Sequence, residues 1–249
     1  MKSLVASLIC VLGFATAGLA AADTPVYELR IYYTAPGKMP DLLKRFRDHT
    51  CKLFEKQGMV NIGYWLPVEA KDQDKLYYVL RHASRDAAKA SWAAFGADPE
   101  WKAVRDASEA AGKIVVKVDS VFLTATDYNP ALPKLTGGHV FELRTYTCNE
   151  GKLDGLDARF RDHTLALFAK HGMTNVLYMH PLDADKGAGK TLIYFLAHAS
   201  VDAAKASFDA FRNDPDWIKA RDASEANGKL LANPPASIFL TPTDFSALK

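Results

Sequence analysis

The residue types that could do chemistry recur at alternate positions in two places. Near the start of the chain, Glu28, Arg30 and Tyr32 are two residues apart, and alternate residues of a β-strand share one face. The same three types return 114 residues later as Glu142, Arg144 and Tyr146. A guanidinium beside a carboxylate can orient an anionic or oxygen-bearing ligand, and it can also form an ion-pair cluster that fixes packing. Both interpretations stay open.

Two histidines are further candidates. His49 and His163 each follow an aspartate and lie on the apolar face of a predicted helix. A buried imidazole can act as a general base or as an axial heme ligand, so heme is a candidate cofactor. The alternative is a core histidine that is hydrogen-bonded to its neighbours. The sequence has no cluster with metal-ligand spacing, which predicts no metal site, and it assigns no catalytic residue.

These candidates belong to a repeat that covers almost the whole chain. Residues 45–50 return unchanged as residues 159–164, and residues 86–91 return as residues 202–207. About half of the aligned positions are identical, which indicates two homologous domains. We predict a signal peptide at 1–22, domains at 23–128 and 139–249, and a Pro- and Gly-containing linker at 129–138.

Each copy has the hydrophobic periodicity of a strand, a helix, two strands, two helices and a strand. Ser84 and Asp98 are predicted to cap the second and third helix of the first copy. The order βαββαβ is that of a ferredoxin-like unit, so the predicted class is α+β. In the first copy we expect strands at 26–34, 59–67, 75–83 and 114–124, and helices at 40–57, 85–95 and 99–112.

A ferredoxin-like sheet has helices on one face only, and its bare face needs a cover. The second copy supplies an identical sheet, so we expect the two sheets to pack face to face or to curl into a shared barrel. The two Glu-Arg-Tyr trios are expected between the sheets, whereas Tyr27, Leu29 and Ile31 are expected to meet the helices. Met179 replaces Trp65 in the second copy and would make such a pocket asymmetric. The predicted ligand-binding residues are Glu28, Arg30, Tyr32, His49, Tyr64, Trp65, Glu142, Arg144, Tyr146, His163 and Tyr178.

The N-terminus has the pattern of a secretory signal peptide. Lys2 precedes an uncharged apolar run from Leu4 to Phe14, and small residues precede Asp23. We therefore expect a secreted or periplasmic protein without a stable membrane span after cleavage, and the alternative is an uncleaved anchor. Cys51 and Cys148 would remain, either as one disulfide or, as we favour, as buried free thiols.

Composition limits the class of function. The 249 residues include 31 Lys and Arg against 29 Asp and Glu, a net charge of +2. Balanced charge without a basic block, and without aromatics interleaved among Lys and Arg, argues against nucleic-acid binding. The hydrophobic content of 49% excludes a disordered or collagen-like chain.

Both copies contain the same set of short segments, which in the first copy are Tyr27–Arg30, residues 45–50, Gly58-Met59, His82–Ser84 and Asp98-Pro99 with Trp101. Together these segments resemble the NIPSNAP family. The resemblance covers nearly all of 26–128 and 140–245. It implies tandem ferredoxin-like domains that form an intramolecular dimeric α/β barrel. Relatives in that superfamily include heme-binding enzymes, cofactor-free oxygenases and isomerases.

Three functions follow as hypotheses. The first is an exported protein that binds a small apolar or aromatic ligand, with heme as one candidate, between its sheets. The second is a structural or interaction module without a ligand, which could assemble further as a homo-oligomer. The third, a cofactor-independent oxygenase or isomerase, depends on the resemblance alone. A closed void above roughly 300 Å³ reached by Arg30 or His49 would favour the first, and a packed, dry seam would favour the second.

Overall fold

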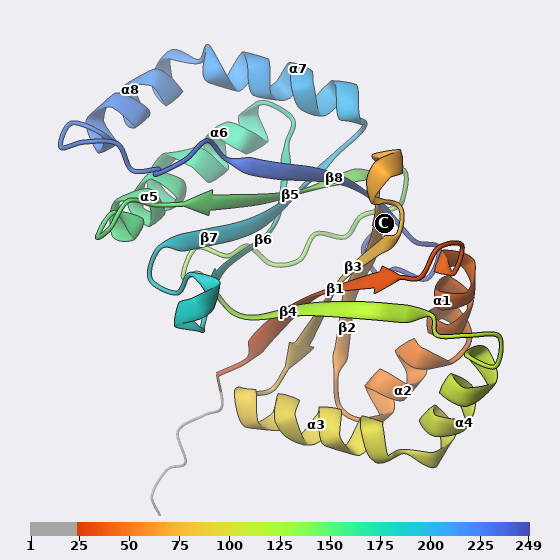
Figure 1. Cartoon of the computed structure of the whole chain (residues 1–249). Helices are drawn as coiled ribbons and strands as arrows, with labels where there is room; N and C mark the ends of the chain where they lie inside the picture. The colour runs from red at the N-terminus through yellow and green to blue at the C-terminus, as the bar shows by residue number, and fades with distance from the viewer. Residues whose placement is uncertain (1–23) are drawn as a thin grey trace, which may run out of the picture.

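The computed structural model describes residues 24–249 as two similar halves with helices outside the strands (Figure 1). The predicted signal peptide lies outside the described residues. The first half contains β1 (Val26–Thr34), α1 (Met39–Arg45), η1 (Phe46–Thr50), α2 (Cys51–Lys56), β2 (Val60–Pro67), η2 (Ala70–Asp72), β3 (Lys75–His82), α3 (Arg85–Ala97), α4 (Pro99–Ser108) and β4 (Val115–Ala125). The second half contains β5 (Val140–Thr147), α5 (Leu153–Arg159), η3 (Phe160–Thr164), α6 (Leu165–Lys170), β6 (Thr174–Pro181), η4 (Ala184–Lys186), β7 (Thr191–His198), α7 (Val201–Arg212), α8 (Pro215–Ser224) and β8 (Ala236–Pro242).

The strands form one closed antiparallel barrel in the order β1-β3-β2-β8-β5-β7-β6-β4. The halves join where β2 pairs with β8 and where β4 pairs with β6. Closure removes the sheet edges of both halves and gives each bare sheet face a cover. The predicted α+β class and the shared barrel are therefore confirmed.

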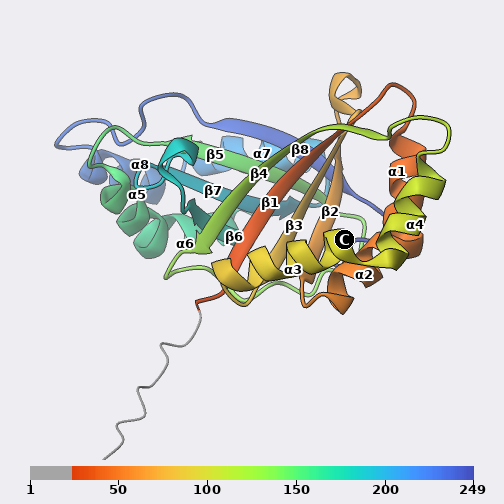
Figure 2. The same ribbon diagram turned by 60° about the horizontal axis from the view of Figure 1, so that its bottom comes forward.

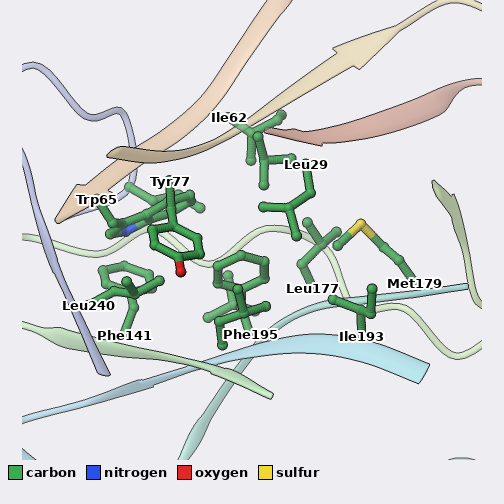
Figure 3. Packing of buried hydrophobic residues seen from close by; sticks show 14 of the residues in the cluster. Leu29, Ile62, Trp65, Tyr77, Phe141, Leu177, Met179, Ile193, Phe195 and Leu240 are labelled. Carbon is green, nitrogen blue, oxygen red and sulfur yellow. The ribbon is translucent and has the colours of Figure 1, made fainter. Parts of the chain in front are cut away.

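Apolar side chains from both halves fill the barrel interior (Figure 3). The Trp65 ring lies beside Phe141 and Phe195, with ring centroids 5.3 and 5.2 Å away. Tyr27 and Leu29 belong to this core. An eight-stranded barrel is just wide enough for side chains to fill it, so the seam between the halves is a packed core.

The prediction that the Glu-Arg-Tyr trios lie between the sheets is wrong. The side chains alternate along β1 as predicted, but Tyr27 and Leu29 line the barrel interior and the Glu-Arg-Tyr face meets the helices. A charged group inside the barrel would lose its water with few donors to replace it, whereas the helix side offers indole, imidazole and hydroxyl donors. The residues that the structure places on the helix side are Glu28, Arg30, Tyr32, Glu142, Arg144 and Tyr146.

Trp65 fits the barrel because Gly63 leaves room for it. A Cβ at position 63 would lie 2.2 Å from the indole of Trp65, closer than any real contact. The second half solves the same packing problem with Leu177 and Met179, both of which are buried in the core. The difference between the copies at these positions is therefore a complementary exchange of volume inside the barrel.

The helix predicted at 40–57 is continuous, but its middle turn, η1, is a π-helix. A π-turn takes in more residues than an α-turn, so the buried positions run Leu42, Phe46 and Thr50. His49 falls outside that stripe, and His163 does the same in η3, where the π-turn is repeated. Both imidazoles are exposed, so the expectation that they are buried is wrong.

The C-terminal arm, residues 243–248, packs on the first half. Phe245 contacts Phe46 and Tyr64, with ring centroids 6.3 and 5.3 Å away. Asp244 accepts two hydrogen bonds from the Arg47 guanidinium, at 2.6 and 2.8 Å. The last residues of the chain therefore complete the helix-side core of the half to which they do not belong.

The middle arm, residues 126–129, makes the reciprocal contact with the second half. Tyr128 lies near Phe160 and Tyr178, with centroids 6.4 and 5.9 Å away. Asp127 accepts hydrogen bonds of 2.9 and 2.8 Å from Arg161. Each half therefore depends on the other, because each arm packs on the opposite half and strands of the two halves pair at both seams.

Candidate functional site

Glu28 is the centre of a buried polar cluster on the helix side of β1. Its carboxylate accepts hydrogen bonds from Arg30 (2.5 Å), Ser120 (2.7 Å), Trp92 Nε1 (2.7 Å) and His82 Nε2 (3.1 Å). Burial alone would raise the pKa of Glu28, but the His82 hydrogen bond, the charge of Arg30 and the other donors lower the pKa to about 2. Glu28 is therefore ionised at neutral pH and its oxygens are fully used.

Arg30 is held by this cluster, but part of its guanidinium stays open. Its Nε donates to Tyr78 Oη at 2.9 Å, and its Nη1 donates to Glu28. The guanidinium carbon lies 4.2 Å from the Trp92 ring centroid and 5.6 Å from that of Tyr32. The side chain is 16% exposed, and Nη2 has no hydrogen-bond partner among residues 24–249.

The second half repeats the cluster with fewer donors. Arg144 and His198 donate to Glu142 as their counterparts do, and burial of Glu142 is again outweighed, so its pKa is lowered. Phe208 stands where the first half has its tryptophan, which removes the indole donor. Arg144 Nη2 donates to Tyr146 at 3.4 Å. The two clusters therefore differ at Nη2, which has a partner in Arg144 and none in Arg30 among the described residues.

Three of the predicted ligand-binding residues, Tyr64, Trp65 and Tyr178, do not share a pocket. Tyr64 stacks on Tyr78 at 5.3 Å and Tyr178 stacks on Tyr194 at 5.0 Å, each on the helix side of its own half. Burial raises the pKa of each of these four phenols well above its usual value. Trp65 lies on the other side of the sheet, inside the barrel.

His49 lies on the rim of an open groove of about 700 Å³ between α1–η1 and α4, named here the first-half groove. Arg45 also lines the groove. Its side chain is 4% exposed, and its Nη1 lies 3.2 Å from Glu109 Oε1. The apolar wall comes from α4 and the residues that follow it, and the charged wall from α1 and η1. These walls consist of Ala103, Val104, Ala107, Ala110 and Ala111 on one side and Lys38, Asp41, Lys44, Asp48 and His49 on the other.

The corresponding second-half groove is smaller, about 400 Å³, and His163 lies on it. Lys219 occupies the position that Ala103 has in the first half and lines this groove. The charged side chain on the α8 wall makes the second-half groove a poorer receptor for an apolar molecule.

Sequence reasoning missed two of the donors to Glu28, Trp92 and Ser120. Trp92 lies 64 residues and Ser120 lies 92 residues from Glu28 along the chain, so no local spacing connects them. His82 did give a signal, because it recurs as His198 and shares a strand face with a tyrosine four residues earlier.

A second polar cluster, which the sequence did not reveal, ties the middle arm to the second half. Tyr128 Oη donates to Asp157 at 2.6 Å, and His180 Nε2 donates to the other carboxylate oxygen at 3.1 Å. His180 Nδ1 donates to the Thr191 carbonyl at 2.8 Å. Because both ring nitrogens face acceptors, the ring is favoured in its charged form. Burial would lower the pKa of His180, but these two hydrogen bonds outweigh it and raise the pKa.

The NIPSNAP family model matches residues 27–130 and again residues 141–247. The chain belongs to the NIPSNAP family. The double match agrees with the two structural halves, which repeat the same order of strands and helices. No curated protein sequence matches the chain.

Two solved structures are similar in fold to this NIPSNAP chain over most of its length, and a third matches less than half of it. A monooxygenase-like protein from Lactobacillus acidophilus is 12% identical, with a TM-score of 0.58 over 88% of this chain and 94% of its own. An anthrone oxidase-like protein is 16% identical, with a TM-score of 0.55 over 91% and 95%. A NIPSNAP-like domain protein from Burkholderia xenovorans is 17% identical over 45% and 95%, with a TM-score of 0.38. At these identities the likeness concerns the fold.

Cys51 and Cys148 are free, and burial raises the pKa of each thiol to about 11. Both are therefore protonated and unreactive near neutral pH. Within residues 24–249, no helix is long and apolar enough to cross a membrane. The same residues contain no group of three or more His, Cys, Asp or Glu side chains arranged to hold a metal ion.

Proposed function

We propose that this NIPSNAP chain binds a small apolar ligand in the first-half groove. The observation that carries the proposal is the groove itself, whose volume of about 700 Å³ suits a small organic molecule. Its α4 wall is formed by alanines, Val104 and Ser108, and its opposite wall is charged. A ligand with an apolar body and a polar end would match both walls.

This location replaces the space between the sheets, which apolar side chains fill. Heme is not carried into the proposal, because an exposed His49 on an open groove does not fit a buried axial ligand. The likeness to monooxygenase-like barrels supports the fold and brings no reaction to this chain.

The test is binding of N-phenyl-1-naphthylamine, an uncharged probe whose fluorescence rises in apolar sites. Ala107→Trp would fill the first-half groove, and Ala223→Trp makes the same change in the second-half groove as a matched control. Both alanines are exposed, so neither substitution disturbs a core. We expect A107W to weaken binding about tenfold, which is ~1.4 kcal/mol, and A223W to leave it unchanged. Equal effects of the two variants would contradict the proposal.

A structural module without a ligand is the second candidate, because the packed barrel and the satisfied Glu28 need no ligand to explain them. Native mass spectrometry of the protein purified from its own host separates the two. A retained small molecule supports binding, whereas a bare chain that also fails to bind the probe supports the structural module. The same spectrum reports whether the chain forms a homo-oligomer.

We also propose that the protein acts outside the cytoplasm, because residues 1–22 have the order of charge, apolar run and small residues of a signal peptide. Cell fractionation followed by N-terminal sequencing tests this. A mature N-terminus at Asp23 in the exported fraction is expected, and an intact Met1 in the cytoplasm would contradict export.

A further inference from the structure

We infer that the outer face of β1 and β4 in the first half is a second ligand site, where Arg30 binds the carboxylate of a small aromatic acid. This site shares no residue with the walls of the first-half groove. In Figure 2, β1 and β4 run side by side and no helix lies over β4.

The guanidinium of Arg30 has donors to spare. Of its five N–H groups, Tyr78 takes the one on Nε and Glu28 takes one on Nη1. Both N–H groups on Nη2 lack a partner among the described residues, and the side chain is 16% exposed. The free edge of a guanidinium matches a planar carboxylate.

The surrounding residues fix this edge in place. Glu28 holds Nη1, and its own position is fixed by His82, Trp92 and Ser120. Since all four donors to Glu28 come from the protein, the carboxylate has no need of water or ligand. Arg30 is therefore a prepositioned cation with unpaired donors and a side chain that is 16% exposed.

An apolar surface continues from the guanidinium along β4. Ser120 pairs with Arg30 across the strands, and Val118 pairs with Tyr32. Val118 therefore lies one pair further along the same face, and it is 41% exposed. An aromatic acid bound through its carboxylate would rest its ring on Tyr32 and Val118 and remove this apolar surface from water.

The second half is weaker in both features. The Nη2 group of Arg144 already uses one of its two N–H groups to donate to Tyr146. The second half also has no strand residue equivalent to Val118, because β8, the counterpart of β4, begins only at Ala236, after Pro234 and Pro235. One acid should therefore bind per chain.

The test is calorimetric titration of the purified protein with naphthalene-2-carboxylate, with 2-naphthamide as the uncharged control. Arg30→Lys keeps the charge but loses the planar fork, and Arg144→Lys makes the same change in the other cluster. We expect one site per chain, affinity weakened about tenfold or more by R30K and less than about twofold by R144K, and much weaker binding of the amide. Equal losses in the two variants, or equal affinity for acid and amide, would overturn the inference.

Val118→Glu provides a test that does not depend on the buried cluster. The side chain is exposed, so the variant should fold, while its carboxylate would repel the acid. Binding unchanged in V118E would also overturn the inference. Ala107→Trp distinguishes the two sites, because naphthoate affinity that is lost in A107W and kept in R30K would assign the acid to the first-half groove.

Discussion

The cluster of Tyr128, Asp157 and His180 allows a sharp test of how polar contacts hold the middle arm. The equivalent residues at the helix-side core of the first half are Phe245 of the C-terminal arm, Leu43 and Leu66. The triple variant Tyr128→Phe, Asp157→Leu and His180→Leu therefore installs a set of side chains that the fold already accommodates. The single variant His180→Leu removes only the cation.

The two variants should differ strongly in stability. The side chains of Asp157 and His180 are 16% and 17% exposed, so their ion pair is largely removed from water. Removing His180 alone leaves a mostly buried carboxylate with only Tyr128, and we expect a loss of roughly 3 kcal/mol in the free energy of unfolding. The triple variant buries no charge at this place, so it should stay within about 1 kcal/mol of the parent near pH 6.

The pH dependence has a definite sign. The pKa of His180 is raised above its unfolded value of about 6.5, so its contribution to stability is complete below that pH. The contribution is lost as the pH rises through the folded pKa. The parent should therefore lose stability relative to the triple variant as the pH increases above about 6.5.

Urea unfolding of the parent and both variants at several pH values between about 5.5 and 8.5 measures these differences. The single variant should be the least stable at the acid end. Single and triple variants of equal stability, or a parent-to-triple difference that does not change with pH, would refute the reasoning that a charged His180 fastens the arm.

Three further predictions concern the barrel, the C-terminal arm and heme. Gly63→Leu alone should cost roughly 3 kcal/mol or more in thermal or urea unfolding because it displaces Trp65, whereas adding Trp65→Met should recover most of the loss. Phe245→Ala should cost about 2–3 kcal/mol, while Arg47→Ala, which breaks an exposed ion pair, should cost much less. Titration with hemin should give no Soret shift that depends on His49, and a shift abolished by His49→Ala would contradict the placement of that imidazole.

The fold could be predicted from local patterns and the repeat. Ser84 Oγ accepts a hydrogen bond from the Ala87 amide, and Asp98 caps α4 through the Glu100 amide, as the sequence indicated. A helix cap involves residues only two or three positions apart, so the sequence alone can indicate it. The repeat then required a partner for each bare sheet face, and the closed barrel provides it.

The site could be predicted only in part, because the alternation of side chains along a strand does not determine which face of the sheet the helices cover. Alternation along β1 groups Glu28 with Arg30 correctly, but it does not say which face meets the helices. A single π-turn moved His49 from the buried face of its helix to the surface, and the hydrophobic spacing around it is nearly the same for either turn. Trp92 and Ser120 reach Glu28 from distant elements, which single-sequence reasoning cannot place.

Joining the two halves in one chain explains why they can differ. In an assembly of identical subunits, Gly63 and Trp65 would occur twice in the same barrel, and a second indole would have to fit where Leu177 and Met179 now lie. A tandem chain is free to place bulk in one half and to reduce it in the other. The same freedom leaves Nη2 of Arg30 without a partner among the described residues, whereas Nη2 of Arg144 donates to Tyr146. If the asymmetry served packing alone, the barrel interior would show it and the helix-side clusters around Glu28 and Glu142 would not. The differences at Arg30 and in the first-half groove lie outside the barrel core, which favours a role in binding for the first half.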